Sequence, residues 1–166
     1  AVYLALFKRY DAVLVHETSP ITVGIPAVIV KKIQRIPLYF WVLDLWPESL
    51  TAAGGINNKY IIGIFTAITR WIYRNSTKIL ISSKGFAKSI CEKGDFADKI
   101  VYFPNWVDSA LTVTADVATP DVPNGFVAMF TGNIGASQDF GTVLSAAEQL
   151  KEHKDIHLVV VGNGRF

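Results

Sequence analysis

Short apolar runs alternate with helical patterns along the whole chain. The clearest run, Ile36 to Leu43, contains no charged residue, and a run that short and that apolar is typical of a strand buried on both faces of a parallel sheet. Other strands are predicted at 11–15, 77–81, 100–103, 126–130 and 156–161, with helices between them. This alternation predicts right-handed crossovers and a doubly wound α/β fold.

Capping residues define the ends of the predicted helices. Ser19 and Pro20 are expected to open a helix that runs to about residue 35, and Pro26 is expected to kink or split it. Asn57 or Asn58 is expected to cap a long helix over 59–74. A short helix is predicted from Pro47 to the glycines at 54 and 55, and Ser82 and Ser83 are expected to cap the helix that carries Phe86 and Ile90.

Composition divides the chain into parts of two domains. Residues 109–124 are rich in Thr, Ala, Asp and Pro without a strong period, which predicts a linker. Residues 1–108 and 125–166 are therefore expected to be two Rossmann-like doubly wound domains, both incomplete, within a longer protein. Hydrophobic residues make up 51% and charged residues 18% of the 166 residues, so the chain can bury a core.

Charge and cysteine content limit the function classes. A net charge of +2 is too small to indicate a nucleic-acid partner. Cys91 is the single cysteine, so a reducing compartment is the simpler inference. No apolar run is long enough to span a bilayer, and no cluster has zinc spacing.

Acidic and aromatic residues follow the predicted strand over Ile36 to Leu43. Parallel sheets bind ligands outside the carboxyl ends of their strands, and Asp44, Trp46 and Glu48 occupy that edge. Asp44 is either a general base or sugar-hydroxyl ligand, or the cap of the helix that starts at Pro47. Trp46 either packs against a sugar ring or belongs to the core.

His16 and Glu17 are expected at the same edge, at the exit of the preceding strand. A lone histidine is more often a structural group than a catalyst, although the convergence of two strand ends favours a site. His153 and His157 flank the start of a strand, at the opposite edge, and receive no role.

Glycine-bearing turns follow the two strands of the second domain. Gly132 to Gly135 precede a helix, so the pattern indicates either a phosphate site or a tight turn. The next strand ends in Gly162 and Asn163 rather than in the acidic residue that a dinucleotide fold places there. This difference argues against a nicotinamide cofactor.

The predicted helix over 59–74 is apolar around most of its circumference. A narrow stripe carries Lys59, Arg70 and Arg74. The helix is expected to be buried, or alternatively to lie on an anionic membrane with its aromatic and basic residues.

Three segments together resemble the family-4, GT-B-fold glycosyltransferases that build bacterial surface polysaccharides such as lipopolysaccharide and capsule. Asp44-Leu45-Trp46-Pro47-Glu48-Ser49 is similar to a motif of the N-domain of that group, and Phe103-Pro104-Asn105-Trp106-Val107-Asp108 to the segment that closes this domain. The segments 130–135 and 161–165 resemble the first donor-binding loops of the C-domain. The resemblance covers nearly the whole chain in the right order.

The resemblance implies a retaining transfer from a nucleotide-sugar donor to a glycan or lipid-linked acceptor, without a bound metal or cofactor. It implies catalytic roles for Asp44, Glu48 and His16 and acceptor contacts for Glu17 and Trp46. Donor contacts are expected from Gly132, Asn133, Gln138, Gly162, Asn163 and Gly164. The protein is expected in the cytoplasm, with peripheral contact to the membrane through 59–74.

Two departures from the family pattern keep other functions open. Many members carry arginine at the position of Asn133 and lysine at or near Gln138, so the diphosphate site of this chain is poor in charge. Leu43 stands where a histidine often precedes the aspartate. The alternatives are an NAD(P)-binding Rossmann oxidoreductase and a non-catalytic two-lobed protein that binds nucleotide sugars.

Overall fold

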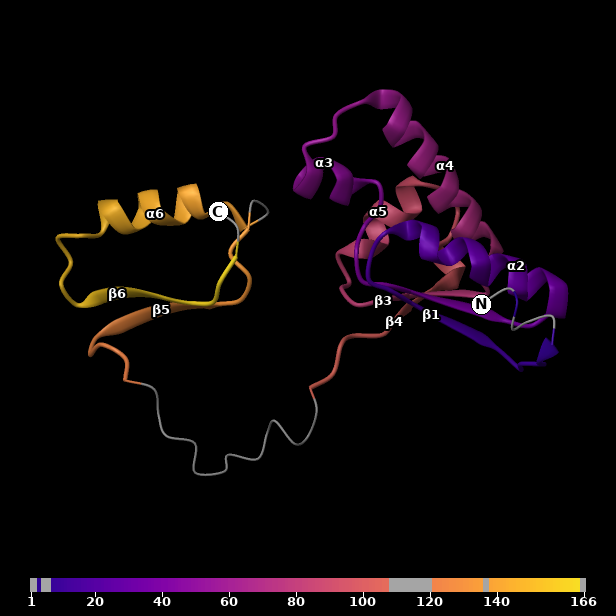
Figure 1. The fold of residues 1–166 in the computed structure, drawn as a ribbon, viewed down its shortest axis with the longest axis horizontal. Helices are drawn as coiled ribbons and strands as arrows, with labels where there is room; N and C mark the ends of the chain where they lie inside the picture. Colours follow the sequence, from indigo (N-terminus) through magenta and orange to yellow (C-terminus); the bar gives the residue numbers. More distant parts are fainter. Residues whose placement is uncertain (1–2, 4–6, 108–120, 136–137, 165–166) are drawn as a thin grey trace. The chain divides into compact units, whose positions relative to one another are not determined.

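A computed structural model describes residues 3, 7–107, 121–135 and 138–164. They belong to two compact units, which comprise residues 1–107 and 108–166 (Figure 1). We call them the N-terminal unit and the C-terminal unit. Most of the predicted linker, residues 109–124, lies outside the described residues.

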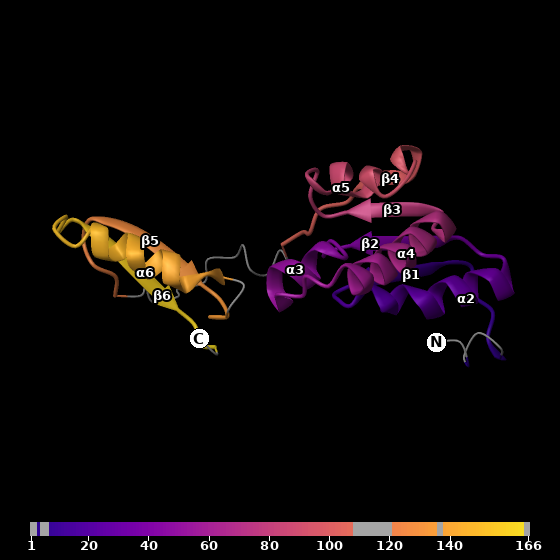
Figure 2. The ribbon, with the colours of Figure 1, turned by 90° about the horizontal axis from the view of Figure 1, so that it is seen from above.

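A parallel four-stranded sheet forms the centre of the N-terminal unit. Its strands lie side by side in sequence order (Figure 2): β1 (Val13–Glu17), β2 (Leu38–Val42), β3 (Lys78–Ile81) and β4 (Ile100–Tyr102). The register aligns Val15 with Phe40, Phe40 with Ile79, and Ile79 with Ile100, so these four side chains share one face. The predicted α/β class with parallel strands is confirmed.

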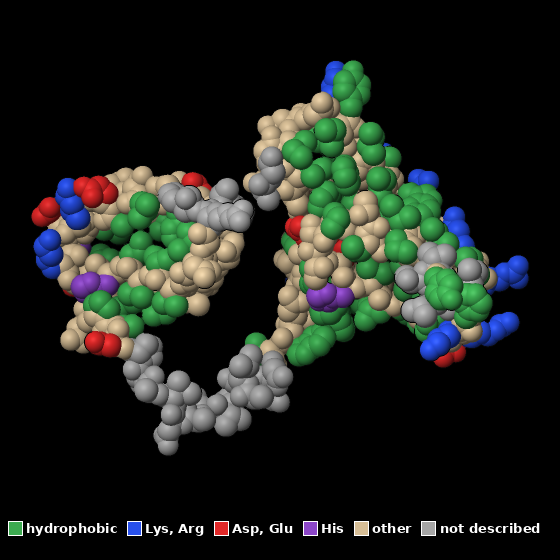
Figure 3. All heavy atoms as spheres, viewed as in Figure 1, with side chains coloured by type: hydrophobic (Ala, Val, Ile, Leu, Met, Phe, Trp, Pro, Cys, Tyr) green, Lys and Arg blue, Asp and Glu red, His purple; other side chains and the backbone are tan. Residues whose placement is uncertain are grey.

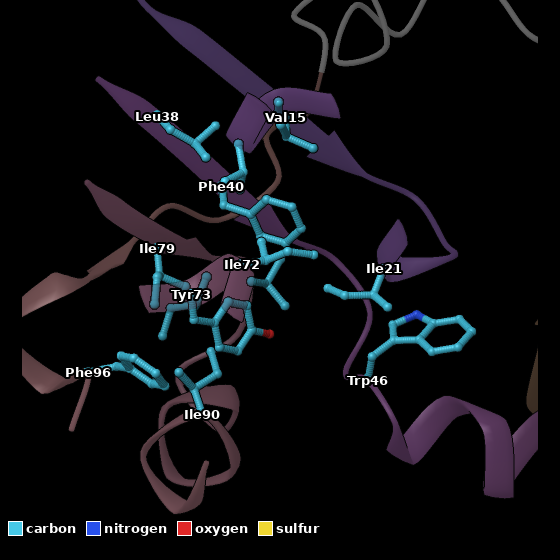
Figure 4. Packing of buried hydrophobic residues seen from close by; sticks show 14 residues of the cluster. Val15, Ile21, Leu38, Phe40, Trp46, Ile72, Tyr73, Ile79, Ile90 and Phe96 are labelled. Carbon is cyan, nitrogen blue, oxygen red and sulfur yellow. The ribbon is translucent and has the colours of Figure 1, made fainter. Parts of the chain in front are cut away.

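Helices cover that face (Figure 1). They are α2 (Gly24–Gln34), α3 (Glu48–Gly54), α4 (Lys59–Asn75) and α5 (Phe86–Glu92), with 3-10 turns η1 (Ile21–Val23) and η2 (Ala97–Lys99). Side chains from α4 and α5, among them Ile72, Tyr73 and Ile90, fill the core against Phe40 and Ile79 (Figure 4). The strands follow in sequence order beneath these helices. Each connection in the described sheet therefore moves the chain to the next strand in the same direction.

Several element boundaries differ from the prediction. β1 continues to Glu17, two residues past the predicted end. Ser19 does not cap the next helix, which begins as the 3-10 turn η1 after Pro20. Pro26 neither kinks nor splits α2, because it occupies the first turn, where a backbone N–H has no intrahelical acceptor. The predicted cap of α4 is confirmed, since the Asn58 side chain accepts hydrogen bonds from two backbone N–H groups.

The described residues of the C-terminal unit form a β-α-β segment. β5 (Phe126–Thr131) and β6 (Ile156–Val161) are parallel and pair along their whole length, and α6 (Phe140–Gln149) connects them. The rings of Phe130 and Phe140 meet edge to face at 5.0 Å and hold the helix against the sheet.

Candidate functional site

The turn between β2 and α3 presents Asp44 at the carboxyl edge of the sheet. Its half-buried carboxylate accepts a hydrogen bond from the Ser49 hydroxyl. The N-cap residue of α3 is Pro47, and no side chain caps the helix. The capping alternative for Asp44 is therefore wrong, because its carboxylate bonds to a side chain five residues later and not to the helix backbone.

Glu48 ties α3 to α5. Its carboxylate accepts hydrogen bonds from Lys93 Nζ at 2.6 Å and from the Ser89 hydroxyl at 2.5 Å. Burial alone would raise the pKa of Glu48, but these bonds to Lys93 and Ser89 outweigh it and lower the pKa. The side chain that was expected to be catalytic is thus an ionised partner of a buried lysine.

Glu17 lies in the core beneath the turn after β2 and does not face solvent. The side chain is fully buried on the helix-covered face of the sheet, and Oε2 accepts from the backbone N–H groups of Leu43 at 3.3 Å and Asp44 at 3.2 Å. Oε1 has no partner among the described residues. Burial, aided by the nearby Asp44 charge, raises the pKa of Glu17 to about 7 despite the two backbone hydrogen bonds. The predicted acceptor contact is replaced by a contact that shapes the turn.

Trp46 packs into the core instead of facing solvent (Figure 4). Its ring lies 5.2 Å from that of Phe65, which is the core-packing alternative considered for this residue. The indole Nε1 and the nearby core hydroxyl of Tyr73 are both buried without a partner among the described residues. Burial raises the pKa of Tyr73, and the charges of Glu17 and Glu48 raise it further.

His16 lies on the opposite face of the sheet, which α2 to α5 do not cover, and sequence reasoning did not anticipate an aromatic cluster there. Its ring meets Trp41 edge to face at 4.9 Å, and Trp41 stacks on Trp106 at 5.6 Å. A hollow of about 340 Å³ is lined by His16, Trp41, Asn105 and Trp106. Asn105 and Trp106 belong to the motif from Phe103 to Asp108. The motif alone does not reveal the stack of Trp106 on Trp41 of β2, because the fold brings these distant segments together.

The two glycine-bearing turns of the C-terminal unit extend the pairing of β5 and β6. Gly132 N–H donates to Val161 O, and Ile134 N–H donates to Asn163 O, both at 2.9 Å. A Cβ atom on Gly162 would lie 1.8 Å from Gly132 O, and one on Gly164 would lie 1.8 Å from Ile134 O. Close contact between the turns therefore explains both glycines without a ligand.

Asn133 and Gln138 are exposed beside these turns. At Gly132 an added Cβ would meet only the Phe130 ring within 4 Å, at 3.4 Å. Residues 126–135 contain no lysine or arginine. The side chains that this edge exposes at 133 and 138 are therefore neutral amides.

The described part of the chain lacks two features that would indicate other kinds of site. No helix there is long and apolar enough to cross a membrane. No group of three or more His, Cys, Asp or Glu side chains among those residues could hold a metal ion.

Comparisons with known proteins add sequence and fold relatives. No protein-family model matches the chain. The chain is 29% identical over 123 residues to the "Putative colanic acid biosynthesis glycosyl transferase WcaI" of Escherichia coli (strain K12), a match that covers 69% of this chain and 30% of the relative. It therefore spans about a third of the length of that relative.

Solved structures of Anabaena Alr3699/HepE share the fold. The complex with UDP matches with a TM-score of 0.66 and 16% identity over 99% of this chain and 43% of that one. The complex with UDP-glucose matches with a TM-score of 0.60 and 15% identity over 93% and 40%. The expected resemblance to glycosyltransferases is confirmed by these matches, whereas membership of family 4 stays a prediction.

Proposed function

We propose that the complete protein transfers a sugar from a nucleotide-sugar donor to a glycan acceptor. The observation that carries this proposal is the similarity to a putative glycosyl transferase over more than two thirds of the chain. The shared fold with a protein solved in complex with UDP and with UDP-glucose supports a nucleotide sugar as the donor.

The C-terminal unit is the proposed donor side. A nucleotide sugar presents a diphosphate, which backbone N–H groups and a helix N-terminus can bind without a lysine or arginine. Gly132 leaves room for close approach, and Asn133 offers a neutral amide donor beside it. Gln138 stands just before α6, whose N-terminus carries a positive dipole.

The N-terminal unit is the proposed acceptor side. Asp44 is a half-buried carboxylate oriented by Ser49, which suits a base or a ligand for a sugar hydroxyl. His16 is exposed at the same edge of the sheet, at the end of β1. Glu48 instead holds α3 in place. We expect a retaining reaction that needs no bound metal or cofactor.

Sugar transfer by the complete protein tests the proposal. Purified protein is incubated with UDP-glucose and other nucleotide sugars and with extracted lipid-linked glycans, and UDP release and glycosylated product are measured. Asp44→Asn should lower turnover by roughly 100-fold, whereas the exposed-site control Asp95→Asn should not change it. Proton NMR of the anomeric signal reports retention, and EDTA should leave the rate unchanged.

Two outcomes would contradict a transferase. Tight UDP binding without turnover of any donor would favour the non-catalytic alternative, which the uncharged Asn133 and Gln138 motivate. Binding of NADPH in place of UDP would favour the oxidoreductase.

Peripheral contact with the cytoplasmic face of the membrane is the proposed route to a lipid-linked acceptor. Hydrophobic side chains reach the surface over α4 (Figure 3). Among them are Tyr60 and Ile64, with Lys59 and Arg70 exposed nearby on the same helix. An apolar face flanked by basic residues is typical of helices that lie on anionic lipid.

Liposome flotation tests this contact. The protein should float with vesicles that contain anionic phosphatidylglycerol and less with purely zwitterionic ones. Ile64→Glu should abolish flotation, and Leu14→Glu, at a position equally exposed on the sheet, should not (61% and 60% exposed). Equal flotation of both variants would contradict the assignment to α4.

A further inference from the structure

We propose that the hollow lined by His16, Trp41, Asn105 and Trp106 is a carbohydrate subsite, in which Trp106 stacks on a pyranose ring of the acceptor. This inference rests on the proposed function, which supplies the glycan acceptor. It assigns the hollow to a sugar unit of that acceptor that lies beyond the reacting hydroxyl. The residues come from β1, from β2 and from the segment after β4.

Trp106 is an exposed ring that its neighbours hold in place. The side chain is 70% exposed, yet its ring stacks on Trp41 with an angle of 12° between the planes. Phe103 meets Trp41 edge to face at 5.0 Å and Trp106 at 6.0 Å. A supported indole offers a flat apolar surface with little entropy to lose, which suits the C–H face of a sugar ring.

Polar groups around the hollow are available for sugar hydroxyls. Trp41 is only 6% exposed and its indole nitrogen is buried, so this ring lines the hollow as an apolar support and not as a hydrogen-bond donor. The exposed His16 ring can donate and accept, and the Asn105 amide can do both.

The position of the hollow agrees with an acceptor role. His16 and Trp41 are directly paired in the register of β1 and β2, one residue before each strand ends. Asp44 follows β2 at this same carboxyl edge. Ligands of open parallel sheets bind outside this edge, and a mixed aromatic and polar lining is typical of small-molecule sites.

Saturation-transfer NMR on the 166-residue chain tests the subsite directly. Methyl β-D-glucopyranoside and methyl β-D-galactopyranoside are the probes, and uridine is included as a competing flat ligand. At least one glycoside should receive saturation at its ring C–H protons. Trp106→Ala should reduce that signal at least fivefold, while Tyr60→Ala, which removes an equally exposed aromatic ring (72%), should not.

Three results overturn the subsite: no signal from either glycoside, an undiminished signal in Trp106→Ala, or a Trp106-dependent signal from uridine alone. In the complete protein, Trp106→Ala should raise the acceptor KM at least tenfold and leave the donor KM unchanged, and Trp106→Phe should largely restore it. Unchanged acceptor KM with active transfer refutes the subsite while the proposed function stands. Trp106-dependent glycoside binding without transfer of any donor sugar refutes the proposed function instead.

Discussion

We expect Glu17 to make the stability of the N-terminal unit depend on pH. The carboxyl group is fully buried, and within the described part of the chain only one of its oxygens is hydrogen-bonded, to the backbone N–H groups of Leu43 and Asp44. Glu17→Gln keeps an oxygen that can accept these bonds and removes the ionisation. The variant should therefore behave like the wild type with Glu17 protonated.

The magnitude follows from the pKa of Glu17. Burial raises it from an ordinary 4.5 to about 7. Between these values the folded state binds a proton that the unfolded state has released, so stability is full below about pH 4.5 and falls as the pH rises through 7. At about 1.4 kcal/mol per pKa unit, the total loss is about 3 kcal/mol. The pKa of Glu48 is lowered, so its contribution changes at lower pH, outside this window.

Urea unfolding followed by tryptophan fluorescence measures this loss. All four tryptophans lie within residues 1–107, so the signal reports the N-terminal unit. From pH 5 to pH 8 the wild type should lose up to about 3 kcal/mol, and Glu17→Gln should change little. The exposed-site control Glu92→Gln should follow the wild type. Parallel profiles for the wild type and Glu17→Gln would refute the reasoning.

Three further changes have expected outcomes. Lys93→Met removes the partner of Glu48 and should lower the free energy of unfolding by about 1 kcal/mol; the same urea assay would contradict the tie between α3 and α5 if it showed no change. Gly164→Ala places a Cβ atom against Ile134 O and should destabilise the C-terminal unit by roughly 2 kcal/mol or more; hydrogen exchange in β5 and β6 should rise, and unchanged exchange would refute the close contact. Asn58→Ala removes the cap of α4 and should reduce stability by about 1 kcal/mol, with urea unfolding as the measurement and Asn57→Ala as the control.

Local patterns were sufficient to predict most elements of both units. Apolar runs located the strands, and Asn58 marked the start of α4 because capping depends on residues within one turn. The end of β1 was harder to predict, since an apolar run indicates a strand only as far as the apolar residues continue. Glu17 continues the strand as a charged residue, and its partner Val42 is 25 positions away.

The site was predicted less completely, because side-chain orientation depends on pairing between distant segments. The pattern predicted that Glu17 and Asp44 lie at one edge of the sheet. It did not predict that Glu17 lies in the core beneath the turn. Trp46 could be core or surface until Phe65 of α4 was placed beside it. The stack of Trp41 on Trp106 joins residues 65 positions apart, so no local period reveals it.

The paired glycine turns have a consequence for protein engineering. Gly132 and Ile134 on one turn are joined to the turn at Gly162 and Gly164 by backbone hydrogen bonds and by contacts with no room for a side chain. Two loops joined in this way accept an insertion or deletion only as a pair. Libraries that aim to change ligand preference should therefore diversify both turns together and keep Gly162 and Gly164 fixed, so that variation falls on outward positions such as Asn133 and Asn163.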